Sequence, residues 1–351
     1  MSGGSGASLH RASAAAALVL SMLGACTPAQ EGAPAVQVTD RLDSPAETAL
    51  HRELARLAAV TPGSLGACVA LGAEGACVNG QRRYSMQSVM KLLVALAAYD
   101  AADRGALSID DTVLVRREDL SVYVQPIAAL VGRDGYRTTW RDLARRAVVD
   151  SDSAATDVLL ARLGGPAAVQ RVLEAKGLTG IRIDRNERDL QSETAGLSWR
   201  PEFVDPEIFT RAVRAVPEER RAAAQKAYAA DVRDTATPRG MVELLRKLAA
   251  GELLSPRSTT DLLAVMRQTR TFPTRLRAGA PAGWGVGHKT GSSGAFQGRT
   301  TATNDVGLYF PPGGPPIAVA VFLAESPASR EERDAAIAAV GRLAAAGLPS
   351  S

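Results

Sequence analysis

This chain of 351 residues lacks the patterns that identify several common classes of protein. Its formal charge is only +4 and no block of lysines and arginines occurs, so nucleic-acid binding has little support. Beyond the N-terminal region, no apolar run is long enough to span a membrane. The few histidines and cysteines do not fall at metal-site spacings, so we expect no metal and no cofactor.

Lysine is scarce as well, because the 41 basic residues include only five lysines. One of them, Lys91, stands in the run 89–98, in which every other residue is apolar. The run predicts a helix buried on most sides, where a lysine loses its proton more easily and can act as a base. Ser88, on the same helix face, is then an activated nucleophile. The alternative is a chance Ser-x-x-Lys sequence whose lysine reaches solvent at a helix edge.

The N-terminus has the pattern of an export signal. His10 and Arg11 precede the apolar stretch 14–23, and Leu-Gly-Ala then leads to Cys26. This ending resembles a bacterial lipobox, so we expect residues 1–25 to be a lipoprotein signal peptide and Cys26 to be lipidated. An ordinary signal peptide with an incidental cysteine is the alternative. Residues 26–43 resemble a flexible tether, and we expect a monomeric, periplasmic or cell-surface lipoprotein that meets the membrane only through its lipid.

Cys68 and Cys77 flank two short apolar runs separated by a turn that contains glycine. If the runs form an antiparallel hairpin, the two cysteines lie opposite each other across it. An oxidising compartment outside the cytoplasm would then permit a disulfide. Two buried free thiols are the alternative.

Strands are expected at both ends of the remaining chain and helices between them. Ser44-Pro-Ala-Glu47 predicts a helix start, with a capping serine and a proline in the first turn. We therefore expect one α+β domain over residues 44–351, with an antiparallel sheet flanked by helices and an inserted all-helical lobe. The sheet lobe comprises about 44–84 and 276–351, and the helical lobe about 85–275. A cleft between the lobes is the expected place for a site.

Two further motifs carry reactive side chains. Ser151-Asp-Ser153 stands before the helical stretch 154–163, where a serine can relay a proton, although both residue types are also ordinary helix caps. Lys289-Thr290-Gly291 ends a predicted strand on which Gly285 and Gly287 share a face with the lysine. We expect these glycines to leave room for a ligand, whose carboxylate the ammonium could hold. A solvated lysine at a strand end is the alternative.

Glu187 follows a strand-like segment, 180–183, and we expect it in a highly charged loop. A carboxylate directed into a cleft can activate water, whereas an isolated surface acid has no such role.

Taken in order, Ser-x-x-Lys, Ser-Asp-x, the glutamate and Lys-Thr-Gly resemble the class A serine β-lactamases. The resemblance covers roughly residues 44–345. It is strongest to the extended-spectrum branch, in the segments Met86–Val89, Lys289–Gly294 and Thr301–Gly307. It implies the serine β-lactamase and penicillin-binding-protein fold, and hydrolysis of the β-lactam amide through an acyl-enzyme.

The resemblance also implies catalytic roles. Ser88 is the acylating nucleophile, and Lys91 is its base, either directly or by sharing the task with Glu187 through water. Ser151 passes the proton to the lactam nitrogen. Glu187 activates the water that hydrolyses the acyl-enzyme.

Binding roles follow from the same resemblance. Lys289 and Thr290 hold the substrate carboxylate. The backbone N–H groups of Ser88 and Ser292 form the oxyanion hole. Tyr123 is the aromatic wall of the cleft.

Three departures from the family pattern affect substrate contacts. Ser153 stands where the family usually has asparagine and reaches a substrate amide less well. Gln191 replaces the asparagine that helps to hold the hydrolytic water. Glu187 and Thr235 are 48 positions apart, more than usual, and the extra stretch contains helix-like segments at 206–216 and 217–230.

Two other functions share some of these residues. A penicillin-binding DD-peptidase has the serine, the lysine and Lys-Thr-Gly. Glu187 argues against this function, because rapid hydrolysis of the acyl-enzyme needs such a base. A non-catalytic lipoprotein that binds β-lactams or peptidoglycan would not need Ser88, Lys91, Ser151 and Glu187 intact. The sequence therefore favours a hydrolase.

Overall fold

The computed structural model describes residues 49–72 and 74–347. The predicted signal peptide, Cys26, the tether and the helix start at Ser44 lie outside the described residues. No helix in the described part of the chain has the length and apolar character needed to cross a membrane.

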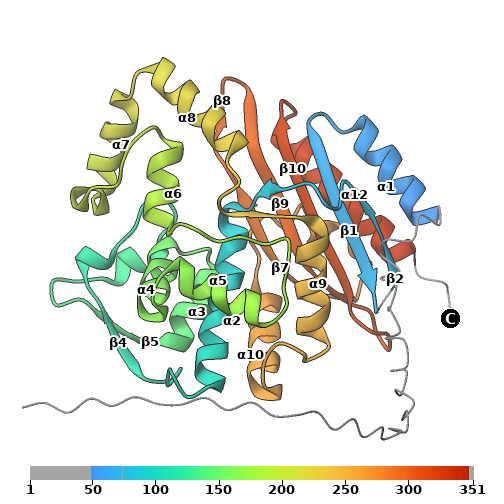
Figure 1. The fold of residues 1–351 in the computed structure, drawn as a ribbon, viewed down its shortest axis with the longest axis horizontal. Coiled ribbons are helices and arrows are strands. Elements are labelled where there is room, and N and C mark those ends of the chain that lie inside the picture. Colours follow the sequence, from blue (N-terminus) through green and yellow to red (C-terminus); the bar gives the residue numbers. More distant parts are fainter. Residues whose placement is uncertain (1–48, 73, 348–351) are drawn as a thin grey trace, which may run out of the picture. The chain divides into compact units, whose positions relative to one another are not determined.

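A six-stranded antiparallel sheet forms one part of the fold, in the order β2-β1-β10-β9-β7, with β8 paired to β9 (Figure 1). Its strands are β1 (Ser64–Leu71), β2 (Glu74–Val78), β7 (Gly285–Ser292), β8 (Ala295–Phe296), β9 (Arg299–Phe310) and β10 (Ile317–Ser326). Segments from the two ends of the described chain thus share one sheet. Together with the helices between them, they confirm the predicted α+β class.

Alternate residues of the sheet face two separate hydrophobic cores, as a period of two requires. Leu65 and Val69 of β1 pack with α1 (Ala49–Val60) and α12 (Arg330–Ala346). Cys68 and Ala70 belong to the other core, with α2 (Met90–Asp103) and α9 (Pro238–Ala249). Figure 1 shows α1 and α12 on one side of the sheet and α9 on the other.

Helix α2 runs through the centre of the larger core. Every residue from Met90 to Ala101 is buried, which confirms the helix predicted from its apolar run. The helices around it are α3 (Trp140–Val149), α4 (Ser153–Leu163), α5 (Pro166–Ala175) and α10 (Pro256–Gln268). Two short strand pairs complete this region: β3 (Tyr84–Ser85) with β6 (Thr235–Ala236), and β4 (Thr112–Val115) with β5 (Tyr136–Thr139).

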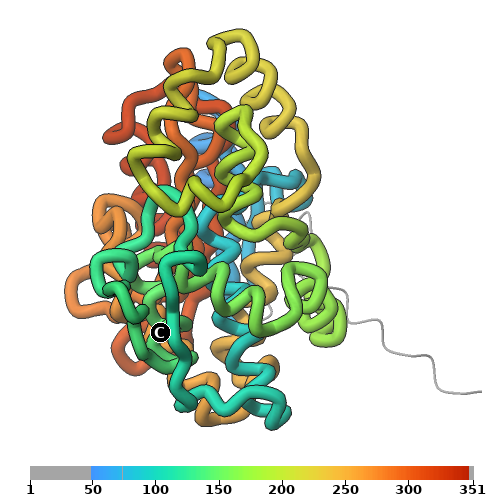
Figure 2. The backbone as a smooth tube through the Cα atoms, turned by 90° about the vertical axis from the view of Figure 1, so that its left-hand side faces the viewer, coloured from blue at the N-terminus to red at the C-terminus, as the bar shows by residue number. Residues whose placement is uncertain are grey.

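The extra stretch after Glu187 forms helices, as its sequence predicts. It contains α7 (Pro206–Ala215) and α8 (Glu218–Ala230), after α6 (Glu187–Thr194). Phe203 and Phe209 pack edge to face at 5.3 Å in a small core of their own with Val122. In Figures 1 and 2 the yellow segment that holds α8 lies at the end of the sheet where the orange β8–β9 hairpin turns.

The predicted disulfide is present. Cys68 and Cys77 face each other in the register of β1 and β2, with a Cα–Cα distance of 4.1 Å and an S–S bond. The hairpin therefore brings the two thiols together, as expected from their positions around the turn.

Candidate active site

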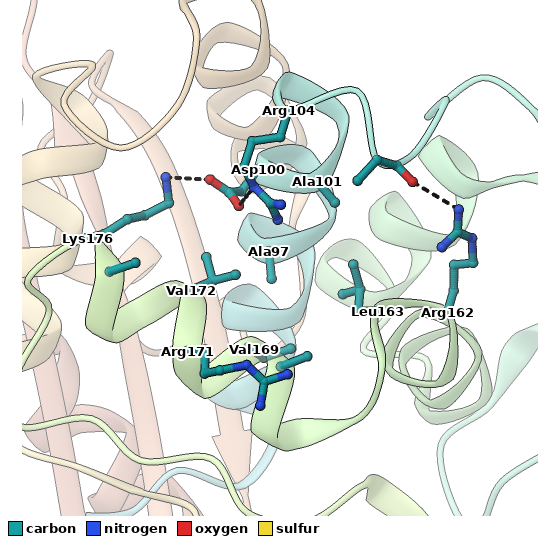
Figure 3. A pocket seen from close by; sticks show the side chains of 13 residues that line it. Ala97, Asp100, Ala101, Arg104, Arg162, Leu163, Val169, Arg171, Val172 and Lys176 are labelled. Atoms are coloured by element: carbon teal, nitrogen blue, oxygen red, sulfur yellow. Dashed lines mark hydrogen bonds and ion pairs between the residues drawn. The ribbon is translucent and has the colours of Figure 1, made fainter. Parts of the chain in front are cut away.

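A cleft of about 400 Å³ brings together most of the side chains singled out in the sequence. Its lining includes Ser88, Lys91, Ser153, Glu187, Gln191, Tyr123 and Ser292. A larger cavity of about 570 Å³ lies between α2, α4 and α5 (Figure 3), and none of the predicted site residues lines it. The chemistry therefore belongs to the smaller cleft.

Ser88 lies in a 3₁₀ turn, Gln87–Val89, that leads directly into α2. Gln87 has φ +48°, a left-handed conformation that a residue other than glycine adopts at a cost of about 1–3 kcal/mol. Strand β7 approaches this turn closely, since a Cβ atom on Gly291 would lie 2.4 Å from the carbonyl oxygen of Met86. Asn304 of β9 donates its side-chain amide to the same carbonyl at 3.1 Å. The turn that carries Ser88 is thus held by the sheet.

Lys91 is 1% exposed and lies among oxygen atoms. Its ammonium donates to the backbone oxygen of Ser151 at 2.6 Å and to Ser153 Oγ at 3.0 Å. It also lies 3.7 Å from Glu187 Oε1. Within the described residues, no hydrogen bond joins it to the Ser88 hydroxyl. Ser88 precedes the first residue of α2, and the other acceptors draw the ammonium toward α4.

Glu187 is the first residue of α6, so its predicted place in a loop is wrong. Asn186 caps the helix by accepting from the Asp189 N–H, and the acidic residues of the first turn favour the helix dipole. The segment 180–183 is also not a strand, because only Ile181 forms an isolated bridge, to Ala236. The other residues of this segment form no β-ladder in the described structure.

The two carboxylate oxygens of Glu187 have different surroundings. Oε2 accepts from Ser153 Oγ and from Gln191 Nε2, both at 3.3 Å. Oε1 is buried and accepts no hydrogen bond from the described residues. This oxygen is therefore available to take a proton, while the other is held in place.

Asp157 of α4 fixes the backbone around this glutamate. Its Oδ1 accepts from the Glu187 N–H at 2.7 Å, and its Oδ2 accepts from Ser121 Oγ at 2.8 Å. Burial, and then the negative charge of Glu187, raises the pKa of Asp157 to about 7. Two carboxylates thus lie close together in a buried region, and the charge of Glu187 disfavours the ionisation of Asp157.

Ser151 and Ser153 flank the N-cap of α4, as their sequence pattern predicts. Asp152 caps the helix by accepting from the Ala155 N–H, and Ser151 has φ +57°. This conformation directs the two serines to different partners. Ser151 Oγ accepts from Lys289 Nζ at 2.9 Å, whereas Ser153 Oγ lies between Lys91 and Glu187.

Lys289 and Thr290 are almost fully buried at the centre of β7. Burial, and then the positive charge of Lys91, lowers the pKa of the Lys289 ammonium well below its usual range. Thr290 Oγ1 is 2.8 Å from Thr271 Oγ1. Neither is a solvated residue at a strand end.

The expected role of Gly285 and Gly287 is wrong. A Cβ atom on Gly285 would lie 2.7 Å from the Arg267 guanidinium, and one on Gly287 would lie 3.2 Å from Met266 Cβ. Both neighbours belong to α10, so these glycines allow a helix, and not a ligand, to pack against β7.

Several residues of the site have no signal in the sequence. Arg275 donates to Ser292 Oγ at 2.8 Å and is itself held by Asp334 at 2.6 Å. Its partners come from distant segments, so the sequence pattern does not reveal it among so many arginines.

A second group without a sequence signal links α8 to the nucleophile. Gln87 accepts from Gln191 Nε2 at 3.2 Å and donates to the hydroxyl of Tyr228, which also contacts Ser85 Oγ. Burial raises the pKa of Tyr228 to about 12, so it is a neutral phenol. Helix α8 thereby reaches the residue next to Ser88.

Tyr123 lies at the rim of the cleft. It is 58% exposed, has φ +58° and packs edge to face on Phe209 of α7 at 5.0 Å. The extra helices therefore support the residue expected to be the aromatic wall.

The assembled site can perform acyl transfer. A serine at a helix start lies in a cleft with a buried ammonium and a buried carboxylate, and a second lysine is hydrogen-bonded to a second serine. Among residues 49–72 and 74–347, no group of histidine, cysteine, aspartate or glutamate side chains could hold a metal ion.

Comparison with known proteins gives consistent matches. A sequence model of the β-lactamase enzyme family matches residues 49–348. The chain is 30% identical over 272 residues to the extended-spectrum β-lactamase PER-1 of Pseudomonas aeruginosa, covering 77% of each chain. Its fold is similar to a β-lactamase from Chitinophaga pinensis, with a TM-score of 0.69 and 28% identity, covering 84% of this chain and 97% of that one. An ancestral class A β-lactamase, GNCA, has a TM-score of 0.66 and 35% identity, covering 84% and 98%.

Proposed function

This chain belongs to the β-lactamase enzyme family, as a class A enzyme that hydrolyses the amide bond of β-lactams, and from this premise we propose a role for each residue of its cleft. The observation that carries these assignments is the buried cluster of Lys91, Ser153 and Glu187 beside Ser88.

In acylation, the Ser88 hydroxyl attacks the lactam carbonyl. Lys91 accepts the proton as a neutral amine, directly or with Glu187 through water. The N–H groups of Ser88 and Ser292 stabilise the negative charge that develops on the carbonyl oxygen. Ser151 then gives its hydroxyl proton to the lactam nitrogen and receives in its place the proton removed from Ser88, while Lys289 holds the Ser151 hydroxyl by a hydrogen bond. The C–N bond breaks and the acyl-enzyme forms.

In deacylation, Glu187 takes a proton from water as the water oxygen attacks the ester carbonyl. The bond from the carbonyl carbon to Ser88 Oγ breaks, and the proton passes to Ser88 Oγ. The asymmetry of its carboxylate supports this role, because Oε1 is available and Oε2 is held by Ser153 and Gln191. Gln191 thus supports the base itself in this chain. Ser153 contributes to the same support and to the substrate side of the cleft.

Lys289 and Thr290 bind the carboxylate of the substrate ring. An anion beside Lys289 favours the charged ammonium, which opposes the effect of burial on its pKa. Tyr123 forms the aromatic wall at the rim.

For the intact protein we propose export as a lipoprotein anchored through Cys26. The sequence Leu-Gly-Ala-Cys motivates the anchor, and the Cys68–Cys77 disulfide fits an oxidising compartment. Cys26→Ser should release the protein from the membrane fraction or block its processing. An unmodified N-terminus by mass spectrometry together with unchanged fractionation would refute the anchor.

Steady-state hydrolysis of a chromogenic cephalosporin by the purified domain tests the catalytic proposal. Ser88→Ala should abolish turnover and leave thermal unfolding nearly unchanged, because it removes one half-buried hydroxyl. Wild-type protein that acylates but does not turn over would support the DD-peptidase alternative. Normal turnover by Ser88→Ala would eliminate Ser88 as the nucleophile.

A further inference from the structure

Helix α8 directs one face toward the cleft and the β8–β9 hairpin. The contacting residues are spaced by three, four and three positions, as one face of a helix requires. They are Glu218, Arg221, Gln225 and Tyr228. Glu218 accepts from Gln297 at 2.9 Å, and Gln225 accepts from Thr301 Oγ1 at 3.2 Å. These contacts fix the rotation of α8, and with it the side chain between them.

Arg221 is that side chain, and it lines the same cleft as Ser88. Its guanidinium lies 5.5 Å from the centre of the Phe296 ring. No acidic side chain in the described part of the chain forms an ion pair with it, and its buried Nε has no hydrogen-bond partner there. Arg221 is thus a half-buried cation without a partner anion. Its planar N–H groups match the geometry of a carboxylate, so it is suited to bind an anionic group of a ligand.

The place of Arg221 along the cleft indicates which part of a substrate it meets. Lys289 and Thr290 are assigned to the ring carboxylate, and Ser292 follows them at the oxyanion hole. The chain then leads through residues 293–295 to Phe296, against which Arg221 packs. In a penicillin the reacting carbonyl lies between the ring carboxylate and the acylamino side chain. Arg221 is therefore on the side of the acylamino group.

We propose that Arg221 is a specificity-determining residue that binds an anionic group on the acylamino side chain of the β-lactam. The inference rests on the function proposed above and names the substrate class that this cleft favours. The inserted helix α8 supplies the cation, and the contacts on either side of it in the helix hold it at the cleft.

Carbenicillin and benzylpenicillin test this proposal, because they differ only in a carboxylate on the acylamino side chain. The readout is the ratio of their kcat/KM values. Arg221→Gln should lower the carbenicillin-to-benzylpenicillin ratio about tenfold, near the lower end for loss of a charge-assisted hydrogen bond. Arg221→Lys should lower it less. The matched control is Arg220→Gln, which removes an exposed charge from the same helix and should leave the ratio unchanged.

An unchanged ratio in active Arg221→Gln, or an equal fall in Arg220→Gln, overturns the role of Arg221 alone. Failure of the wild type to hydrolyse benzylpenicillin overturns the proposed function as well. A measurement on the wild type needs no variant: raising NaCl should lower the ratio, because salt screens the additional charge pair. A ratio that is independent of salt contradicts the proposal even if the variants do not fold.

Discussion

Replacing Glu187 with glutamine tests the hydrolysis of the acyl-enzyme, which is the step that distinguishes a β-lactamase from a DD-peptidase. The side chain keeps its size, but a glutamine has only one oxygen. That oxygen can lie near Lys91 or accept hydrogen bonds from Ser153 and Gln191, but it cannot do both. The amide nitrogen cannot take a proton from water. General-base catalysis contributes roughly 10²–10⁴-fold, so deacylation should slow by at least about 100-fold, equivalent to about 3 kcal/mol or more.

The assay is intact-protein mass spectrometry after mixing with benzylpenicillin. Glu187→Gln should retain the added mass of the opened penicillin on Ser88, whereas the wild type should show little adduct at steady state. Acylation is timed separately in the first turnover, because Glu187 shares that step if Lys91 acts through water. Asp189→Asn is the control, since it removes the same charge from the first turn of α6 outside the cleft.

Two results would refute the reasoning. If wild type and Glu187→Gln deacylate at the same slow rate, the glutamate takes no part and the DD-peptidase alternative gains support. If both deacylate rapidly, another group activates the water.

Three further predictions concern stability. Replacing Cys68 and Cys77 with alanine should lower the free energy of unfolding, measured in guanidinium, by about 2.5 kcal/mol, because the bridge closes a loop over a separation of nine residues in the unfolded chain. An unchanged free energy would show that the bridge does not constrain the unfolded chain. Tyr228→Phe should cost about 1–3 kcal/mol in thermal unfolding, because Gln87 loses a buried partner; an unchanged melting temperature would contradict that contact. The raised pKa of Asp157 means that the folded state binds the proton more tightly than the unfolded state, so wild-type stability should fall relative to Asp157→Asn as pH rises from about 4 to 7; a constant difference would exclude this titration.

The sequence predicts best what local patterns determine. The helix expected at 154–163 begins one residue earlier in the structure, at Ser153, and ends at the expected residue. The signals that predict this helix, its cap at Asp152 and the apolar residues that follow, are all local in the sequence. The two helix-like segments of the extra stretch, 206–216 and 217–230, also form helices, α7 and α8.

The wrong or missing predictions have two physical causes. Either the contact that determines the structure is made by a residue distant in the sequence, or a high density of charged residues obscures the apolar pattern. Helix α6 has eight residues, and the dense charge around its asparagine cap conceals any apolar period. Gly285 and Gly287 mark a close approach correctly, but the approaching element, α10, cannot be identified from β7 alone. Nor does any local pattern connect Arg275 with Ser292, because a side-chain contact joins them across 17 positions.

Helix α8 shows why the same limit applies to specificity. Alanine and charged residues occupy most positions of α8 on all of its faces, and only Tyr228 is buried. No apolar stripe therefore indicates which face turns inward. Partners on the β8–β9 hairpin and in the turn of Ser88 decide that orientation. A shift of α8 by one residue would rotate Arg221 about 100° away from Phe296 and remove the cation from the cleft. Substrate preference in this enzyme therefore depends on contacts that hold the insertion, as much as on the reactive residues that identify its family.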